Sequence, residues 1–406
     1  MNILMISHYA GGPRYGMEFR SYYMALEWVR QGHQVLIVGA SYSHLRKVQP
    51  EVGHERIDGI DYLWLPTRSY EGNGIRRVQT MLQFVAQVYR HRRELISFHP
   101  DMVIASSVYT FDLYPCRHIA RRTGAKLVYE VHDLWPLSPQ VIGGYSRWHP
   151  FIWLLQRGEN YAYRHCDMVV SMLDKALPHM QRHGLDAARF CCIPNGYLES
   201  EWQENQEPLP RSHSDLLEQL HKEGKTVVGF AGGHTASTAL HVLVEAAHRM
   251  ENREDLAFVL VGNGPQKNEL QQQAAQYPLS HCHFLPALDK RFVPQLLHQF
   301  DICYAGGVHS SLHQYGTSFN KITDYMLAGR PIIFSVDEPG SMVERAGCGI
   351  QVEAEHVEQV CQAIAQLADM SREARENMGE KGRQYALENL NYTTLSKRFI
   401  EVVNGK

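Results

Sequence analysis

The sequence predicts an α/β protein of two domains, each containing a parallel β-sheet with helices between the strands. Its 406 residues are too many for one ordinary hydrophobic core, and 44% of them are hydrophobic, which is enough to fill two. Short β-rich runs alternate with helical stretches as far as residue 197, and the same alternation restarts at Thr226. This pattern is typical of right-handed βαβ units, which build parallel sheets.

The predicted strands follow one another in two sets. The first set spans residues 2–7, 34–39, 102–106, 126–131, 168–171 and 190–193, and the second spans 227–231, 257–262, 281–285, 302–305 and 331–335. A polar segment broken by prolines, 199–211, lies between the two sets. We therefore expect a first domain of residues 1–197, a linker of 198–221 and a second domain of 222–388, with ligands bound at the carboxyl ends of the strands.

The composition excludes several classes of protein. A formal net charge of −3, with 20% charged residues, provides no general attraction for nucleic acid, so we expect no nucleic-acid partner. Residues 1–6 lack the pattern of a signal peptide, and no apolar run is long enough to span a bilayer. The eight cysteines contain no C-x-x-C motif, so we expect neither a zinc site nor disulfides, but reduced thiols in the cytoplasm.

The segment 318–331, Ser-Phe-Asn-Lys-Ile-Thr-Asp-Tyr-Met-Leu-Ala-Gly-Arg-Pro, combines a lysine and a carboxylate with a helix that ends sharply. Lys321 and Asp324 are three residues apart, so both project from one face of the first helical turns, where backbone N–H groups and the helix dipole favour an anion. Gly329 and Pro331 end the helix before a buried strand. The pattern predicts a site for a phosphorylated sugar; the alternative is a pair of ordinary solvated side chains.

Two motifs follow predicted strands of the first domain. His132 and Asp133, in Tyr-Glu-Val-His-Asp-Leu-Trp-Pro, emerge at the carboxyl end of a strand, where folds of this class bind ligands. The alternative for this pair is a structural hydrogen bond and a helix or turn cap. Residues 11–20 form a glycine loop that would let the backbone approach a phosphate or sugar, although a glycine turn also simply joins a strand to a helix.

Taken in order, these motifs resemble those of the retaining nucleotide-sugar glycosyltransferases of GT-B fold, group 1 or family 4, particularly the WbuB-like branch that builds bacterial surface polysaccharides. The resemblance is carried by Gly11-Gly12, His132-Asp133, Pro194-Asn195-Gly196, Gly233-His234, Gly262-Asn263-Gly264-Pro265 and Ala328-Gly329-Arg330-Pro331. It implies two Rossmann-like domains that face a cleft. It also implies that a C-terminal helix, within residues 389–406, crosses back to the first domain.

The resemblance implies roles for individual residues. His132 and Asp133 would lie beside the reacting donor sugar as catalytic residues. Contacts to the donor or its nucleotide are implied for Gly12, Arg14, Gly233, His234, Gly262, Gly264, Leu285, Ala287, Asn320, Lys321 and Asp324. Asp324 would accept hydrogen bonds from ribose hydroxyls, and Lys321 would contact phosphate. No metal or other cofactor is implied, because this fold neutralises the leaving diphosphate with cations and helix ends.

Two motif positions depart from the common pattern of the family. Many relatives carry an arginine and a lysine that hold the diphosphate, where this chain has His234 and Ala239; a neutral imidazole is a poorer counter-charge, so Lys321 becomes the leading cation. Gly316 replaces the first of two glutamates. The favoured function is transfer of a sugar from a nucleotide diphosphate donor, with UDP expected, to a glycan or lipid-linked saccharide. A nucleotide-sugar 2-epimerase and a degenerate, non-catalytic scaffold subunit remain as alternatives.

A contact with the membrane surface is also expected from the sequence. Arg76, Arg77, Arg92 and Arg93 flank an apolar, helix-like stretch, and an aromatic cluster follows at Tyr145, Trp148, Phe151 and Trp153. Both would suit an anionic membrane surface that presents a polyprenyl-linked acceptor. The alternative is that these residues pack on the sheet of the first domain. The expected location is the cytoplasm, at the inner face of the membrane.

Overall fold

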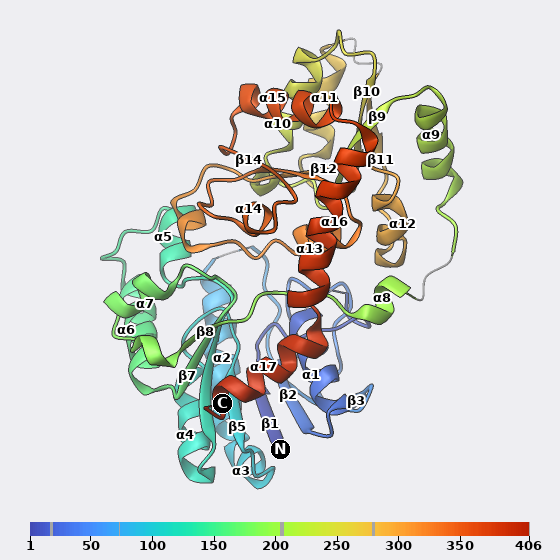
Figure 1. The fold of residues 1–406 in the computed structure, drawn as a ribbon. Helices are drawn as coiled ribbons and strands as arrows, with labels where there is room; N and C mark the ends of the chain where they lie inside the picture. The colour runs from blue at the N-terminus through green and yellow to red at the C-terminus, as the bar shows by residue number, and fades with distance from the viewer. Residues whose placement is uncertain (17–18, 73, 204–206, 278–280, 406) are drawn as a thin grey trace. The chain divides into compact units, whose positions relative to one another are not determined.

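The computed structural model describes residues 1–16, 19–72, 74–203, 207–277 and 281–405, which divide into two compact units (Figure 1). Unit 1 comprises Met1–Asn195 and Tyr392–Lys406, and unit 2 comprises Gly196–Asn391. The boundary lies within the Pro194-Asn195-Gly196 motif. Each unit contains one largely parallel sheet with helices between its strands, so the predicted fold class is confirmed.

The sheet of unit 1 has the strand order β3-β4-β2-β1-β5-β6-β7-β8. Its strands are β1 (Asn2–Ile6), β2 (Gln34–Ala40), β3 (Gly53–Ile57), β4 (Ile60–Leu65), β5 (Met102–Ala105), β6 (Lys126–Val131), β7 (Met168–Ser171) and β8 (Phe190–Cys192). All six predicted strands are present. The hairpin of β3 and β4, whose strands pair antiparallel at the sheet edge, was not predicted. Its two-residue turn is Asp58-Gly59, with positive φ at both positions.

The helices of unit 1 include the one that closes the chain. They are α1 (Phe19–Arg30), α2 (Ile75–Arg90), α3 (Arg92–Ser97), α4 (Leu113–Thr123), α5 (Leu137–Gly143), α6 (Pro150–His165), α7 (Leu177–Arg182) and α17 (Tyr392–Val403). The helix α17 packs on α1, where the buried Trp28 indole donates a hydrogen bond to Ser396 O at 3.1 Å and its ring contacts Phe399. The predicted return of the last helix to the first domain is therefore confirmed.

The sheet of unit 2 has six parallel strands in the order β11-β10-β9-β12-β13-β14. They are β9 (Thr226–Ala231), β10 (Leu256–Val261), β11 (Cys282–Leu285), β12 (Ile302–Gly306), β13 (Ile332–Ser335) and β14 (Gly349–Val352). All five predicted strands are present, and the edge strand β14 was not predicted. Its side chains are all only partly buried, so it lacks the continuous apolar run that marks the central strands.

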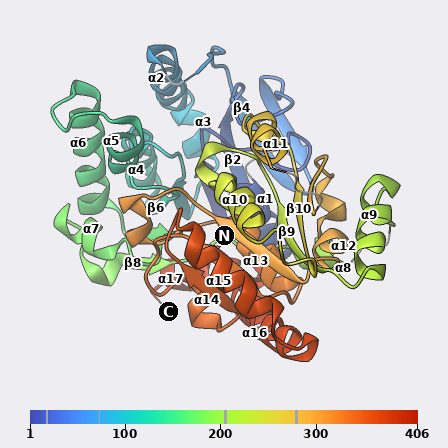
Figure 2. The same cartoon turned by 90° about the horizontal axis from the view of Figure 1, so that it is seen from above.

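The helices of unit 2 fill the connections between these strands. They are α8 (Glu199–Gln203), α9 (Arg211–Lys222), α10 (Leu240–Arg249), α11 (Lys267–Ala275), α12 (Val293–Leu297), α13 (Asn320–Leu327), α14 (Met342–Ala346), α15 (Val357–Ala368) and α16 (Arg372–Asn389). Helix α16 packs against α13, and α10 packs against α15 (Figure 2). Within the described ranges, none of the helices of either unit has the length and apolar content that a bilayer span requires.

The predicted linker, 198–221, belongs to unit 2 in the structure. Helices α8 and α9 occupy most of it, and residues 204–206 lie outside the described part. Leu217 and Leu220, three residues apart on α9, are buried in the core of this unit, and Trp202 packs against the same core. The apolar residues at helical spacing outweigh the polar and proline-rich composition that suggested a free connection.

Candidate functional site

Two glycine turns meet at the carboxyl ends of β9 and β10 in unit 2. The two strands end in register at Ala231 and Val261, and a glycine follows each. A β-carbon built on Gly262 would lie 1.9 Å from Gly232 O, and one on Gly264 would lie 2.3 Å from His234 O. Both glycines have strongly positive φ, 154° and 157°. Only glycine fits these two positions, so the two turns pack directly against each other and form one edge of the predicted donor site.

Gly233 differs from these two glycines. Its backbone is exposed, its φ is not in the left-handed region, and a β-carbon there would come no closer than 3.6 Å to Thr235. Packing therefore does not require glycine at this position. The feature of Gly233 that a ligand would use is its exposed backbone.

His234 lies beneath the turns. Its side chain is completely buried between the rings of Phe230 and Phe284, and neither ring nitrogen has a hydrogen-bond partner among the residues that the structure describes. Burial lowers the pKa of His234 to about 4, and the charges of Lys267 and Lys321 act in the same direction. The imidazole is therefore neutral at pH 7 and supplies no counter-charge for a diphosphate, which leaves Lys321 as the leading cation.

Lys321 stands at the start of α13, beside the first glycine turn. Its ammonium lies 4.5 Å from the centroid of the Phe230 ring and forms no ion pair within the described part of the chain. Burial lowers the pKa of Lys321 to about 8. The Tyr325 hydroxyl, one turn further along α13, accepts a hydrogen bond from Ala231 N at 3.1 Å. This contact fixes the start of the helix against the end of β9, and it places the predicted cation at the strand's carboxyl end.

Asp324 and Asn320 occupy the same helix. Asn320 is exposed, and Asp324 is partly buried one turn later. Burial raises the pKa of Asp324 to about 6, while Lys290 and a hydrogen bond from Trp202 oppose the rise. The carboxyl group is therefore ionised at pH 7 and able to accept hydrogen bonds. Within unit 2, the structure brings Lys321 to the first glycine turn, whereas the neighbours of the Asp324 carboxyl group include Lys290 and Trp202.

Leu285 is the last residue of β11, the strand next to β10, and Ala287 follows it. The carbonyl of Leu285 already accepts hydrogen bonds from Gly262 N at 3.3 Å and from Lys267 Nζ at 2.9 Å, so it is not open to a nucleobase. Ala287 is exposed two residues later. Lys267, which also donates to Gly262 O at 2.8 Å, was not identified from the sequence. Its position as the first residue of α11, just after Gly-Asn-Gly-Pro, is the signal that could have indicated it.

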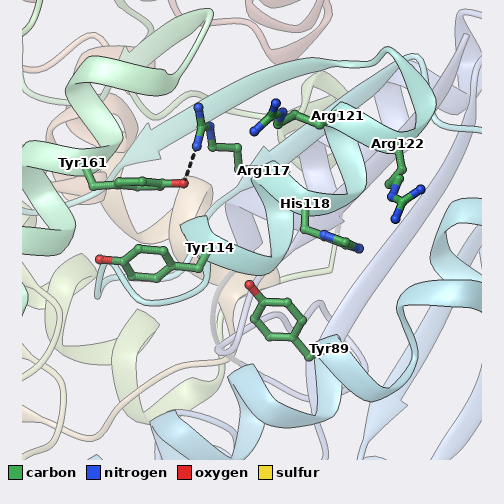
Figure 3. Close-up of a pocket in the computed structure, with 7 residues that line it drawn as sticks. All are labelled: Tyr89, Tyr114, Arg117, His118, Arg121, Arg122 and Tyr161. Carbon is green, nitrogen blue, oxygen red and sulfur yellow. Dashed lines mark hydrogen bonds between the residues drawn. The ribbon is translucent and has the colours of Figure 1, made fainter.

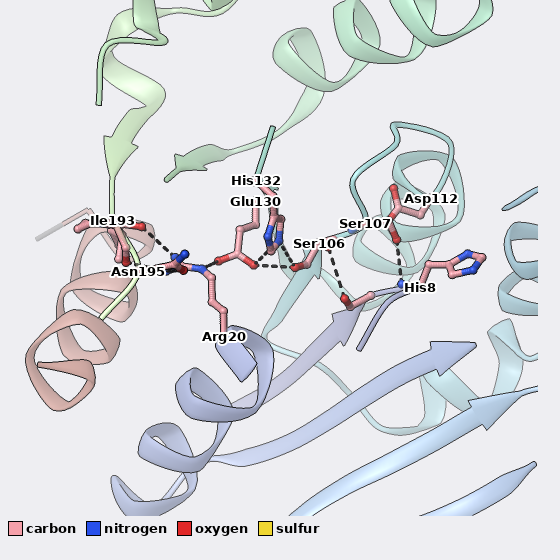
Figure 4. Close-up of polar contacts among 11 residues, drawn as sticks. His8, Arg20, Ser106, Ser107, Asp112, Glu130, His132, Ile193 and Asn195 are labelled. Carbon is pink, nitrogen blue, oxygen red and sulfur yellow. Dashed lines mark hydrogen bonds and ion pairs between the residues drawn. The ribbon is translucent and has the colours of Figure 1, made fainter. Parts of the chain in front are cut away.

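In unit 1, a buried polar chain leads to His132 (Figure 4). Arg20 Nε donates to Glu130 Oε1 at 3.0 Å, and Ser106 Oγ donates to Glu130 Oε2 at 2.6 Å. The same hydroxyl lies 3.0 Å from His132 Nε2. Although burial alone would raise the pKa of Glu130, the charges of Arg20 and His132 and the hydrogen bonds hold it well below its usual range. Glu130 is thus a permanent carboxylate that orients the histidine.

The sequence predicted the place of His132 but not its partners. His132 follows β6 and meets Ser106, which follows β5, because adjacent parallel strands end at the same edge of the sheet. Asp133, the next residue, is exposed at this edge. Glu130 lies two residues earlier within the buried strand, and a carboxylate in such an apolar run is the signal that could have indicated it.

The other predicted residues of unit 1, Gly12 and Arg14, lie in the loop that follows β1. Gly12 is buried, and a β-carbon there would lie 3.3 Å from the Tyr22 ring. Arg14 is exposed and pairs at 2.6 Å with Glu55 of the edge strand β3, so the structure does not group it with the catalytic pair. The carboxylate of Glu55 determines this placement. Residues 17 and 18 of the same loop lie outside the described residues.

One cluster in unit 1 has the residue types of a metal site. The ligand atoms of Glu159, His179 and His183 lie within 4.8 Å of one another. Glu159 Oε1 lies 3.0 Å from both His179 Nε2 and the Tyr163 hydroxyl. These hydrogen bonds satisfy the carboxylate without an ion, and the cluster is formed by α6, α7 and His183, which follows α7.

Comparisons with known proteins agree over most of the chain. A glycosyl transferase 4-like domain matches residues 15–196, and the glycosyl transferases group 1 domain matches residues 225–370. WcaI of Escherichia coli K12, provisionally described as a colanic acid biosynthesis glycosyl transferase, is 23% identical over 412 residues, which cover 94% of each chain.

Solved structures share the fold at low sequence identity. HepE of Anabaena, solved with UDP-glucose, aligns over 100% of both chains with a TM-score of 0.68 and 16% identity. Sucrose-phosphate synthase of Thermosynechococcus elongatus aligns over 100% of this chain and 98% of its own, with a TM-score of 0.73 and 15% identity. The chain belongs to the group 1 glycosyltransferases and has their GT-B fold.

Proposed function

We propose that this glycosyltransferase moves a sugar from a UDP-sugar, with retention of configuration, to a glycan or lipid-linked saccharide in cell-surface polysaccharide biosynthesis. The complex of HepE with UDP-glucose supports the donor class, and the description of WcaI supports the biosynthetic class. The observation that carries the proposal is Lys321, a partly buried ammonium without an ion pair in the described chain, beside a glycine turn and at the start of a helix.

This arrangement suits a nucleoside diphosphate. The ammonium of Lys321 would form charge-assisted hydrogen bonds with the diphosphate, and the exposed backbone at Gly233 and the first N–H groups of α13 would add further donors. The ionised Asp324 would accept hydrogen bonds from the ribose hydroxyls. The leaving diphosphate would then be neutralised by protein groups, so we propose a reaction that requires no metal.

The polar chain of unit 1 suits orientation of the reacting sugar. The Glu130 carboxylate and the Ser106 hydroxyl hold the imidazole of His132 in place, so that it would hydrogen-bond the donor sugar near the reacting carbon. Asp133, exposed at the same edge, would orient the sugar or the acceptor. In a retaining reaction on one face of the sugar, the leaving phosphate itself would accept the proton of the acceptor hydroxyl.

The first experiment measures thermal stabilisation of the purified chain by UDP, GDP, ADP and their common sugars. We expect selective stabilisation by UDP and one UDP-sugar, because a ligand that binds only the folded state raises its melting temperature. Lys321→Ala and Asp324→Ala should reduce the stabilisation, whereas Lys222→Ala, on the exposed face of α9, should not. Stabilisation by GDP or ADP alone would refute the proposal that the donor is a UDP-sugar. If the protein isomerised the donor in the absence of an acceptor, it would be an epimerase.

Unit 1 has an exposed aromatic surface on α5, α6 and their connection. The side chains of Ile142, Trp148 and Trp153 are 78%, 76% and 55% exposed. Arg147 and Arg157 lie 4.7 Å and 4.8 Å from the ring centroids of Trp148 and Trp153. Aromatic rings with adjacent arginines are suited to an anionic membrane interface, so we propose peripheral contact with the membrane that carries the acceptor.

Sedimentation with phosphatidylglycerol vesicles tests this contact. Trp148→Ser with Trp153→Ser should reduce the bound fraction, and Arg76, Arg77, Arg92 and Arg93 changed to Gln should reduce it through lost charge. Leu387→Ser, which removes another exposed apolar side chain, on α16 and outside both regions, is the control. Unchanged sedimentation of both sets of variants would refute membrane contact and would leave the assignment of the donor site intact.

A further inference from the structure

A basic, aromatic pocket lies among the helices of unit 1 (Figure 3). Its volume is about 470 Å³, within the range of small-molecule sites. The lining consists of tyrosines and cationic or imidazole side chains without a carboxylate: Tyr89, Tyr114, Arg117, His118, Arg121, Arg122 and Tyr161. They come from three helices, α2, α4 and α6, which position them on one rigid layer.

Three arginines of α4 supply the charge of this pocket. Arg117, Arg121 and Arg122 lie within little more than one helical turn, and none forms an ion pair within the described ranges. Arg117 Nη1 donates a hydrogen bond to the Tyr161 hydroxyl at 2.7 Å, which holds its guanidinium over the pocket wall (Figure 3). Like charges at this spacing repel one another, so a bound anion would stabilise the arrangement.

The positive charge around the pocket also affects the pKa of a neighbouring histidine. His165 follows Tyr161 by one turn, and the two ring centroids are 4.4 Å apart. Burial lowers the pKa of His165, and the charges of Arg117, Arg164, Arg121 and Arg189 lower it further. Positive charge from α4, α6 and the segment before β8 therefore converges on this end of the pocket.

The tyrosines add a second kind of complementarity. The rings of Tyr114 and Tyr161 lie 4.7 Å apart with a 34° tilt, and Tyr89 lies against His118 at 6.2 Å. Tyrosine offers an apolar ring face and a hydroxyl in one side chain, which matches the C–H faces and hydroxyls of a sugar. A phosphate group fits the arginines, and a sugar ring fits the tyrosines.

The pocket lies away from the predicted catalytic edge of unit 1. In a parallel sheet with right-handed crossovers, each helix runs back toward the amino ends of the strands. Most lining residues follow this rule: Tyr89 is the last residue but one of α2, Arg121 and Arg122 are in the last turn of α4, and Tyr161 is near the end of α6, whereas Tyr114 is in the first turn of α4. His132, by contrast, follows the carboxyl end of β6. From this geometry we infer a second, non-catalytic binding site for a phosphorylated saccharide, independent of the transfer reaction.

Calorimetric titration of the full chain with a hexose 1-phosphate tests the inference. We expect binding that weakens roughly tenfold or more in the variant Arg117→Gln/Arg121→Gln/Arg122→Gln, because charge-assisted hydrogen bonds to phosphate are the strongest polar contacts available there. The uncharged hexose should bind at least tenfold more weakly than its phosphate. The variant Lys222→Gln/Arg372→Gln/Arg383→Gln removes the same charge from exposed positions of unit 2 and should bind like wild type.

Two further arms separate this site from the others. Lys321→Ala should retain hexose 1-phosphate binding, and the triple variant at the pocket should retain both UDP binding and turnover, because the pocket lies outside the donor site. Equal hexose 1-phosphate affinity of wild type and the pocket variant would overturn the inference. The pocket variant could instead lose binding to phosphatidylglycerol vesicles while it binds hexose 1-phosphate like wild type. That result would overturn the inference and would identify the site as one for a lipid headgroup.

Discussion

Arg20 and Glu130 form an ion pair, 3.0 Å from Nε to Oε1, whose side chains are only 5% and 1% exposed. Arg20 comes from α1 and Glu130 from β6, and the remaining guanidinium N–H groups donate to the carbonyls of Ile193 and Pro194. The pair therefore connects a helix, a central strand and the end of the first chain segment of unit 1 (Figure 4). Since Glu130 also holds Ser106 and His132, one buried carboxylate supports both the fold and the proposed catalytic group.

The first prediction concerns the stability that this pair provides. Arg20→Met should lower the free energy of unfolding of unit 1 by about 3–5 kcal/mol, because it leaves a buried carboxylate without its partner. Arg14→Met is the matched control, since Arg14 pairs with Glu55 but is 66% exposed, and it should change stability by less than about 1 kcal/mol. Denaturant unfolding followed by fluorescence measures both. Equal losses in the two variants would contradict the role given to burial.

The second prediction separates two kinds of glycine in the donor site. Gly262→Ala should prevent stable folding of unit 2, because its β-carbon would lie 1.9 Å from Gly232 O at a φ that alanine rarely adopts. Gly233→Ala should fold normally, because the nearest atom to its β-carbon is 3.6 Å away. If the exposed backbone of Gly233 serves the donor, this variant should bind UDP more weakly. Circular dichroism and UDP titration distinguish the two effects.

The sequence predicted the central strands and the edge strands β8 and β11, and it missed the hairpin of β3 and β4 and the edge strand β14. The central strands β9 and β10 are almost entirely buried, so their composition indicates them directly. The strand β3, Gly-His-Glu-Arg-Ile, is polar and partly exposed, and it owes its pairing to the Asp58-Gly59 turn and to β4. Edge strands depend on such partners, which a local pattern of hydrophobicity does not contain.

The site followed the same rule. Helical spacing and the ends of parallel strands depend on nearby sequence alone, so the sequence indicated that Lys321 and Asp324 lie on one helix and that His132 follows a strand, while their roles stay predictions. The contacts that determine charge and orientation were not predictable in this way. Arg20 and Glu130 are 110 residues apart, and Arg14 is held by Glu55, 41 residues away. Packing of distant segments also determines the burial of His234 between Phe230 and Phe284.

The third prediction separates binding from turnover at His132. His132→Ala should leave UDP affinity close to wild type and lower kcat by at least roughly a hundredfold, because orientation of the reacting sugar is lost. Ser106→Ala should show a smaller loss of the same kind, since the hydroxyl lies 3.0 Å from His132 Nε2. His54→Ala, at an exposed pair with Glu94 in the same unit, is the control. A kcat of His132→Ala equal to wild type would refute the catalytic assignment.

The fourth prediction follows from the pKa of Lys321, which burial lowers to about 8. The ammonium, not the neutral amine, attracts the diphosphate, so UDP affinity should fall as pH rises through 8. With a pKa of 8, the protonated fraction falls about tenfold between pH 7 and pH 9, and the affinity should fall by up to that factor. The β-phosphate of UDP is already ionised above pH 7, so the ligand itself contributes little to the change. Calorimetric titration at both pH values measures it.

Substitutions at the same position test whether Lys321 is the titrating group. Lys321→Ala should weaken UDP binding at pH 7 roughly ten- to a hundredfold, the size expected for a hydrogen bond to a charged group. Lys321→Arg keeps its charge over this range, because guanidinium does not lose its proton, so its UDP affinity should be nearly constant between pH 7 and pH 9. Lys222→Ala should behave like wild type at both pH values. If Lys321→Arg shows the same decline as wild type, another group titrates, and the diphosphate is held elsewhere in unit 2.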